Sequence, residues 1–293
     1  MLTLSGTTRV CMSLGYPIAQ SLSPGVQTAA FQACNLDWVY VPWAVRAPDL
    51  ADTVKALRAS ETYAGGNATA PHKEALLALL DGVTPQAARV GAVNVIFRDG
   101  EKLIGDTSDG AGYVAALREA GVEPKGLCVL MLGAGGAARA VGLALVDAGV
   151  RAIGILNRTP ERAATLGRLI REASGQVVNT GPLADAPRLL PEVDLVINAT
   201  SIGLQPGAVP LFDYRPLRGP VVVSDLAFLP RETPFLRQCR EQGCRAMNGL
   251  GMLLHQAVLS FESWTRQPAP VELMRTTLDA VLREREQRAA ASH

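Results

Sequence analysis

Short apolar runs alternate along this chain with longer segments in which apolar residues recur every three or four positions. Residues 9–14 and 38–42 form short runs typical of buried strands, whereas residues 24–34 and 50–59 have helical spacing. This alternation of strand-like and helix-like segments predicts an α/β fold with a largely parallel sheet.

Two further segments complete the pattern in the first part of the chain. Residues 93–97 are apolar and end at Asp99-Gly100, a dipeptide favoured in tight turns, so we expect a hairpin with residues 103–104. Residues 73–80 have helical spacing, and we expect a helix there.

A break at residues 121–126, which contains Gly and Pro, separates this part from a more regular series. Strands and helices alternate after the break as they do in a doubly wound sheet. The strands are expected at residues 128–132, 152–156, 195–198 and 221–225, and the helices at residues 137–148 and 161–173.

The last helix has one apolar face, because Val271, Met274, Leu278 and Val281 recur at spacings of three and four. We expect that face to pack on the first domain. The predicted organisation is therefore a first domain of residues 1–117, completed by residues 249–293, and a second domain of residues 118–248.

Composition narrows the class of protein. The chain has 293 residues, which suits two domains of about 150 residues each, and its 48% hydrophobic content excludes a disordered chain. A net charge of +1 lacks the basic excess of a nucleic-acid-binding protein. The five cysteines and three histidines show no metal-ligand spacing, and no run of 18 apolar residues or signal peptide occurs. We expect a cytoplasmic protein with no metal, nucleic-acid or membrane partner.

A glycine-rich turn follows the first strand of the second domain. Gly133 permits a tight turn, Gly135 lets the backbone approach a pyrophosphate, and the helix that follows directs free N–H groups at the phosphates. The alternative is a turn that packs tightly and binds nothing. The predicted Rossmann-type NAD(P) site contains Gly133, Ala134, Gly135, Gly136 and Ala137.

The next strand indicates which dinucleotide binds. No Asp or Glu stands at its tip, where an NAD site usually places an acid. Arg158 and Arg162 can instead reach a 2′-phosphate, while Asn157 and Thr159 supply polar contacts. These residues favour NADP over NAD, although Glu161, which lies between the two arginines, weakens the preference. The alternative interpretation is that both arginines are solvated side chains at the start of a helix.

Polar residues also cluster in the first domain, where Ser21, Ser23, Lys73, Asn94 and Asp109 occur in short polar motifs. Each has an ordinary structural interpretation: Ser23 can cap a helix, Lys73 can be a solvated lysine, and Asp109 can be a turn residue. Together with the glycine-rich turn, they indicate a substrate site.

Five motifs follow one another along the chain: S-L-S-P at Ser21, N-x-T-x-P-x-K ending at Lys73, G-A-V-N ending at Asn94, N-A-T-S-I-G at Asn198 and G-L-G-M-L-x-x-Q ending at Gln256. With these motifs in this order, the chain resembles the shikimate dehydrogenase family along nearly its whole length. The resemblance implies an NAD(P)-dependent interconversion of 3-dehydroshikimate and shikimate. It also implies that Lys73 is the catalytic lysine and Asp109 its partner in moving a proton.

The resemblance assigns roles to further residues. It implies that Ser21 and Ser23 hold the substrate carboxylate, and that Thr69, Asn94 and Gln256 contact the ring hydroxyls. On the cofactor side it implies that Thr200, Ser201 and Gly249 line the dinucleotide and that Leu226 flanks the nicotinamide.

Several positions depart from the family pattern. Phe228 replaces a tyrosine whose hydroxyl lies near the substrate carboxylate, Thr107 replaces an asparagine, and His72 replaces a phenylalanine. We expect His72 to face solvent. These changes keep open a dehydrogenase of quinate, an aminoshikimate or another hydroaromatic acid, and also a catalytically weak dinucleotide-binding module. The expected partner is a small hydroaromatic carboxylate, and the expected assembly is a monomer or homodimer.

Overall fold

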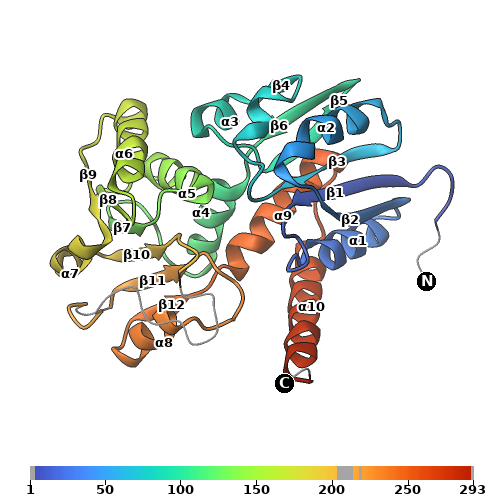
Figure 1. Ribbon diagram of the computed structural model, residues 1–293. Helices are drawn as coiled ribbons and strands as arrows, with labels where there is room; N and C mark the ends of the chain where they lie inside the picture. Colours follow the sequence, from blue (N-terminus) through green and yellow to red (C-terminus); the bar gives the residue numbers. More distant parts are fainter. Residues whose placement is uncertain (1–3, 203–213, 218–219, 292–293) are drawn as a thin grey trace. The chain divides into compact units, whose positions relative to one another are not determined.

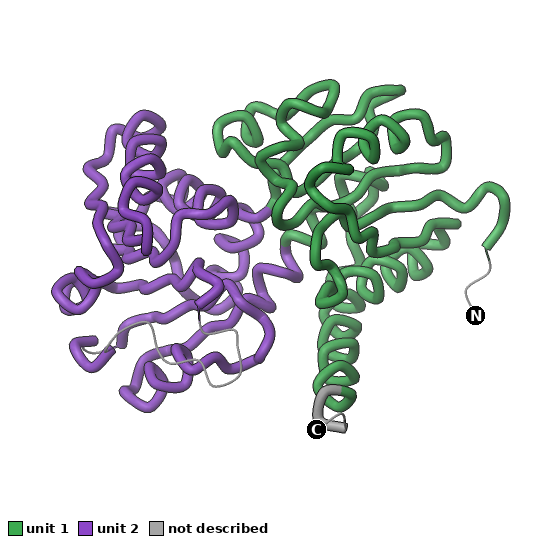
Figure 2. The backbone as a smooth tube through the Cα atoms, in the orientation of Figure 1, with its two compact units in different colours: residues 1–108, 256–293 green, residues 109–255 purple. Residues whose placement is uncertain are grey.

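The computed structural model describes residues 4–202, 214–217 and 220–291, and the chain divides into two units. Unit 1 consists of residues 1–108 and 256–293, and unit 2 of residues 109–255 (Figure 2). The sequence instead suggested breaks after residues 117 and 248. The first break lies earlier because α4 (Asp109–Glu119) packs along α5 (Gly136–Asp147), and a Cβ on Gly110 would collide with the carbonyl oxygen of Ala140.

The sheet of unit 1 is mixed and has the strand order β2-β1-β3-β5-β6-β4. The pairs β2–β1, β1–β3 and β4–β6 are parallel, whereas β3–β5 and β5–β6 are antiparallel. The predicted hairpin is therefore confirmed as β5–β6. The strands are β1 (Arg9–Gly15), β2 (Trp38–Ala44), β3 (Tyr63–Ala68), β4 (Gly82–Val83), β5 (Val95–Asp99) and β6 (Lys102–Asp106).

Helices from both ends of the sequence complete unit 1. The predicted helices at α1 and α2 are confirmed, and α10 packs along α1, where a Cβ on Gly25 would lie 2.8 Å from Val281 (Figure 1). Met274 and Leu278 of α10 are buried, as the apolar face predicted. The helices are α1 (Ser23–Ala33), α2 (Leu50–Ala59), α3 (Pro85–Val90), α9 (Leu250–Thr265), which begins in unit 2, and α10 (Val271–Ala291), with 3-10 turns η1 (Ala47–Asp49) and η2 (Ala75–Ala78).

The core between α1 and α9 is aromatic. The Phe31 ring stacks on that of Phe261 with centroids 5.5 Å apart, and Trp38 packs on Phe31 from β2 at 5.4 Å. Gln27 is also buried there, and its Nε2 donates a 2.9 Å hydrogen bond to the Ala257 carbonyl oxygen. Residues more than two hundred positions apart thus form one core.

The helix predicted at residues 73–80 is wrong, because only the 3-10 turn η2 forms there. The carbonyl oxygen of Lys73 accepts a 2.8 Å hydrogen bond from the Val93 N–H, so it is not part of a helical ladder. A pairing partner distant in the sequence therefore overrides the local apolar spacing.

The sheet of unit 2 is entirely parallel, with the order β12-β11-β10-β7-β8-β9. This is the doubly wound order, in which the chain reverses direction across the sheet between β7 and β10. The four predicted strands are confirmed as β7, β8, β10 and β11. The strands are β7 (Cys128–Leu132), β8 (Ala152–Asn157), β9 (Val178–Pro182), β10 (Leu195–Asn198), β11 (Val222–Asp225) and β12 (Arg245–Met247).

Helices lie on both faces of this sheet, with α5 and α6 on one face and α8 on the other (Figure 1). The central strands are almost wholly apolar because both faces are covered, and Met131, Leu132 and Ile197 are fully buried. The remaining helices are α6 (Pro160–Ser174), α7 (Ala186–Leu189) and α8 (Pro234–Glu241), with 3-10 turns η3 (Leu183–Asp185) and η4 (Leu190–Glu192).

Candidate functional site

A cavity of about 140 Å³ lies at the carboxyl ends of β7, β8 and β10, at the switch point of the unit 2 sheet. Ligands of doubly wound folds bind at this place. The cavity brings together these predicted cofactor residues: Gly133, Ala134, Gly135, Asn157, Arg158, Thr200 and Ser201. Ala199 and Ile202 of the N-A-T-S-I-G motif also line it, as does Leu183, and none of these three was among the predicted site residues.

The glycine-rich turn has the geometry that a dinucleotide requires. Gly133 has φ +114°, and a Cβ there would lie 2.7 Å from the carbonyl oxygen of Ala199. Gly135 is the N-cap of α5, so no side chain caps the first N–H groups of this helix. The space that a Cβ on Gly135 would occupy is open. The uncapped N–H groups of α5 and this open space fit a pyrophosphate. They argue against a turn that only packs tightly.

The far wall of the cavity comes from the turn between β8 and α6. The Nδ2 of Asn157 donates a 2.9 Å hydrogen bond to the Thr159 carbonyl oxygen and fixes this turn. Arg158 is exposed and lines the cavity, whereas Thr159 and Arg162 are exposed but not among its lining residues. Among the described residues that line the cavity, none is an Asp or Glu. A guanidinium without a competing carboxylate fits a 2′-phosphate, and hence NADP.

A buried polar network, whose members were not among the predicted site residues, lies behind this cavity. Asp225 and Asn198 end β11 and β10 and are 0% and 1% exposed. Burial raises the pKa of the Asp225 carboxyl, and hydrogen bonds from the Ala227 N–H, Thr233 and Asn198 act in the opposite direction. The signal that points to this network is a polar residue at the end of each of two otherwise apolar strands.

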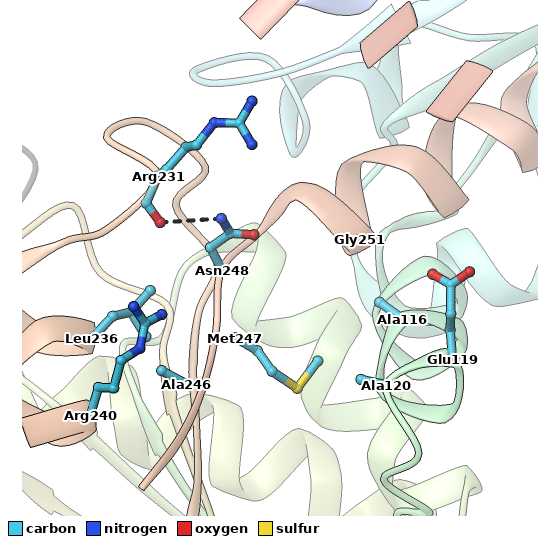
Figure 3. A pocket seen from close by; sticks show the side chains of 10 residues that line it. All are labelled: Ala116, Glu119, Ala120, Arg231, Leu236, Arg240, Ala246, Met247, Asn248 and Gly251. Carbon is cyan, nitrogen blue, oxygen red and sulfur yellow. Dashed lines mark hydrogen bonds between the residues drawn. The ribbon is translucent and has the colours of Figure 1, made fainter. Parts of the chain in front are cut away.

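A second cavity of unit 2, of about 310 Å³, contains none of the predicted site residues (Figure 3). Its charged side chains have protein partners, since Arg240 pairs with Glu232 at 2.6 Å and Glu119 with His255 at 3.1 Å. The lining residues are Ala116, Glu119, Ala120, Arg231, Leu236, Arg240, Ala246, Met247, Asn248 and Gly251.

In unit 1, the turn that carries Lys73 is attached to the end of β1. The Thr69 N–H donates to the Leu14 carbonyl oxygen at 2.9 Å, and the Tyr16 N–H donates to that of Ala70 at 3.1 Å. These bonds hold Thr69 and the half-buried Lys73 in one fixed turn.

The expectation that His72 faces solvent is wrong, because its side chain is only 1% exposed. The ring Nε2 lies 2.8 Å from the carbonyl oxygen of Val45, just beyond β2. The turn directs this side chain inward, where the carbonyl supplies a partner that the sequence pattern does not reveal. Within the described part of the chain, Nδ1 is buried without a hydrogen-bond partner.

The two predicted carboxylate-binding serines lie at the start of α1. The helix begins at Ser23, its N-cap is Leu22, and no side chain caps it. The Ser23 N–H donates to Ser21 Oγ at 3.3 Å. The interpretation of Ser23 as a helix cap is therefore wrong, and its position leaves a role toward a ligand open to it.

Asn94 is 3% exposed and orders the end of the polar segment that precedes Asp109. Its Nδ2 donates to Ser108 Oγ at 3.1 Å, and its Oδ1 accepts from the Ser108 N–H at 2.7 Å. Asn67, the first residue of the motif that ends at Lys73, is equally central, although it was not among the predicted site residues. Its side chain hydrogen-bonds Tyr40, Ser260 and the Asn94 carbonyl oxygen.

The remaining predicted residues lie at defined places in each unit. Asp109 is the first residue of α4 and is 6% exposed, so it is not a solvated turn residue. Gln256 is buried in α9, and Phe228 is half-buried beyond β11. The Gly249 N–H donates to the Ala227 carbonyl oxygen at 2.8 Å, next to the predicted Leu226.

These features define unit 2 as the dinucleotide-binding domain of an oxidoreductase. Family models agree along the chain: the shikimate dehydrogenase substrate binding domain matches residues 14–96, shikimate / quinate 5-dehydrogenase matches residues 116–206, and the shikimate 5'-dehydrogenase C-terminal domain matches residues 249–278. The chain belongs to the shikimate dehydrogenase family.

Individual relatives match over nearly their whole length. A protein of Desulforamulus reducens named shikimate dehydrogenase (NADP(+)) is 41% identical over 280 residues, which cover 94% of this chain and 96% of the relative. The shikimate 5-dehydrogenase of Listeria monocytogenes, solved with shikimate and NAD, is 34% identical with a TM-score of 0.87 over 94% of this chain and 98% of its own. The quinate dehydrogenase of Corynebacterium glutamicum, solved with NAD, is 30% identical with a TM-score of 0.86 over 93% and 99%.

Within the described residues, no helix combines the length and the apolar character needed to cross a membrane.

Proposed function

We propose that this chain catalyses the reversible reduction of 3-dehydroshikimate to shikimate with NADPH. The observation that carries the proposal is the cavity at the switch point of unit 2. In a chain of this family, it combines an uncapped helix N-terminus, an open glycine-rich turn and Arg158 in one place.

The proposed chemistry needs a proton as well as a hydride. When bound, the nicotinamide supplies the hydride, which forms a C–H bond as the ketone π bond breaks. The ketone oxygen then takes a proton from the Lys73 ammonium, and the reverse reaction returns it. Asp109 is proposed to balance the charge of Lys73 while the proton moves.

The other predicted residues are proposed to orient the substrate. Ser21 and Ser23, at the start of α1, would hold the carboxylate. Thr69, in the turn attached to β1, and the buried Asn94 and Gln256 would contact the ring hydroxyls.

A related substrate is the second candidate. Phe228 lacks the hydroxyl that the family pattern places near the carboxylate, and a quinate dehydrogenase is among the similar solved structures. Oxidation of quinate with NAD+ or NADP+ is therefore the alternative.

We also propose that the enzyme acts in the cytoplasm. All five cysteines are free thiols, as is usual for proteins of a reducing compartment.

The test is an initial-rate assay at the NADPH absorbance band, with shikimate and quinate each combined with NADP+ and NAD+. Shikimate with NADP+ is expected to give the highest kcat/KM. Lys73→Ala is expected to lower kcat by about a hundredfold or more, because a positioned acid–base group contributes on that scale. Lys55→Ala, which changes an exposed lysine of α2, serves as the matched control.

Each outcome of this assay distinguishes the proposals. A higher kcat/KM for quinate would replace the first candidate by the second. Absence of turnover with both acids, or an unchanged rate in Lys73→Ala, would refute the proposed reaction.

A further inference from the structure

Asp225 is a fully buried carboxylate that accepts hydrogen bonds from three described residues. Its Oδ1 accepts a 3.0 Å hydrogen bond from the Ala227 N–H. Its Oδ2 accepts from Thr233 Oγ1 at 2.8 Å and from Asn198 Nδ2 at 3.1 Å. A buried charge is costly unless its hydrogen bonds are satisfied, so these three contacts are held firmly in the folded unit.

One branch of this network leads to the cavity at the switch point. Since Nδ2 of Asn198 points to Asp225, its Oδ1 is left to accept from the Thr200 N–H at 3.1 Å and the Thr200 hydroxyl at 2.7 Å. The Thr200 Oγ1 in turn accepts from the Ile202 N–H at 3.1 Å. Thr200 and Ile202 line the cavity, so the orientation of Asn198 sets the position of its wall.

The other branch holds the segment that follows β11. Ala227 is bound through its N–H to Asp225 and through its carbonyl oxygen to the Gly249 N–H at 2.8 Å. Further along the segment, the Arg231 carbonyl oxygen accepts from Asn248 Nδ2 at 3.1 Å (Figure 3). The segment ends at Thr233, whose hydroxyl donates a hydrogen bond to the Asp225 carboxylate. Residues 226–233 are thereby closed into a loop that is anchored at the carboxylate.

We propose that Asp225 and Thr233 are positioning residues for the dinucleotide, which together set the Thr200 wall of the cavity and the segment at Ala227. This inference rests on the proposed function, because it takes the ligand of the cavity to be NADP(H). Neither residue needs to touch the ligand, since Asp225 acts through Asn198 on one side and through Ala227 on the other.

The decisive variant is Thr233→Val, which keeps the carboxylate but removes one of its donors. We expect the Kd for NADPH, measured by fluorescence titration, to rise about tenfold, because a carboxylate that has lost one donor holds Asn198, and through it the Thr200 wall, less firmly in the binding position. Thr233→Ser retains the hydroxyl and is expected to restore the wild-type Kd. Asp225→Asn is expected to weaken binding at least as much, because its amide N–H₂ would face donors.

Thr84→Val is the matched control for the loss of a helix cap. Thr233 caps α8 by accepting from the Leu236 N–H, and Thr84 caps α3 in the same way while donating to Asp106 at 2.5 Å. Thr84 lies in unit 1. Thr84→Val is therefore expected to lower the Tm but to leave the Kd for NADPH unchanged.

The titration does not depend on turnover, so the two proposals can fail separately. A wild-type Kd in both Thr233→Val and Asp225→Asn, or an equal rise in Thr84→Val, would overturn the positioning role. If Asp225→Asn does not fold, Thr233→Val and Thr233→Ser decide the question. Weaker binding in Thr233→Val together with no turnover of shikimate or quinate would support the positioning role while refuting the proposed reaction.

Discussion

Replacing Asn67 by alanine tests how much the buried amide network of unit 1 contributes to stability. The Oδ1 of Asn67 accepts from the Tyr40 hydroxyl at 2.9 Å. Its Nδ2 donates to the Asn94 carbonyl oxygen at 3.0 Å and to Ser260 Oγ at 2.8 Å. One side chain therefore joins β2, β3, the segment before β5 and α9.

The magnitude follows from these three buried contacts. A typical hydrogen bond contributes about 1 kcal/mol, and removing one partner leaves the other desolvated. We expect Asn67→Ala to lower the free energy of unfolding of unit 1 by about 3 kcal/mol. Tyr40→Phe removes the hydroxyl that donates to Asn67, and we expect a coupling energy of about 1 kcal/mol for this one contact in the double-mutant cycle.

Tryptophan fluorescence during urea unfolding is a suitable assay. The chain has three tryptophans, Trp38, Trp43 and Trp264, and all of them lie in unit 1. The signal thus reports the unit that contains Asn67, even where the two units unfold separately. Asn179→Ala, an exposed asparagine of β9 in unit 2, is expected to leave the transition unchanged.

Two results would refute this reasoning. One is a loss below about 0.5 kcal/mol in Asn67→Ala, which is the scale of an ordinary surface substitution. The other is a double-mutant coupling near zero, which would mean that the 2.9 Å contact to Tyr40 contributes nothing to stability.

Three further predictions concern the ligands and the response to pH. Arg158→Ser is expected to raise the KM for NADP+ about tenfold with little change for NAD+, and equal effects on both cofactors would contradict a 2′-phosphate contact. Phe228→Tyr is expected to lower the KM for shikimate about tenfold if the added hydroxyl reaches the carboxylate, and a higher KM would show that it does not. Hydrogen bonds from Thr8 and then Ser5 lower the pKa of Asp37, so its stabilising effect is present above the ordinary pKa and is lost as pH falls through the lower folded value. Asp37→Asn is thus expected to flatten the fall in stability of unit 1 in acid, and urea titrations at several pH values with an unchanged slope would contradict this.

The parts of the fold that the sequence predicted correctly depend on local signals. The strands β7, β8 and β10 are short, mostly apolar runs, and β11 begins with two valines, because both faces of the sheet are covered. The glycine-rich turn was also predictable from the sequence. Gly133 has a positive φ and lies against Ala199, so the position favours glycine.

The errors and omissions share a different physical cause. The helix at residues 73–80 and the orientation of His72 were misjudged because the partners in the structure, the Val93 N–H and the Val45 carbonyl oxygen, are backbone groups that no side-chain pattern reveals. The structural roles of Asn67 and Asp225 were not predicted, because neither the polar motif that begins at Asn67 nor the strand that ends at Asp225 shows which groups will hydrogen-bond these side chains. The polar residues that organise the site therefore need the tertiary structure to be recognised.

Unit 1 consists of two stretches of chain that are separated in the sequence by the whole of unit 2, and this has a consequence for protein synthesis on the ribosome. Gln27 hydrogen-bonds Ala257 from 230 positions away, and Asn67 hydrogen-bonds Ser260 from 193 positions away. At about 5–20 residues per second, translation of the intervening unit takes on the order of ten seconds. During that interval the nascent α1 has no α9 or α10 to cover it. Unit 2 can then finish folding while the earlier half of unit 1 still exposes an aromatic surface that a chaperone would recognise.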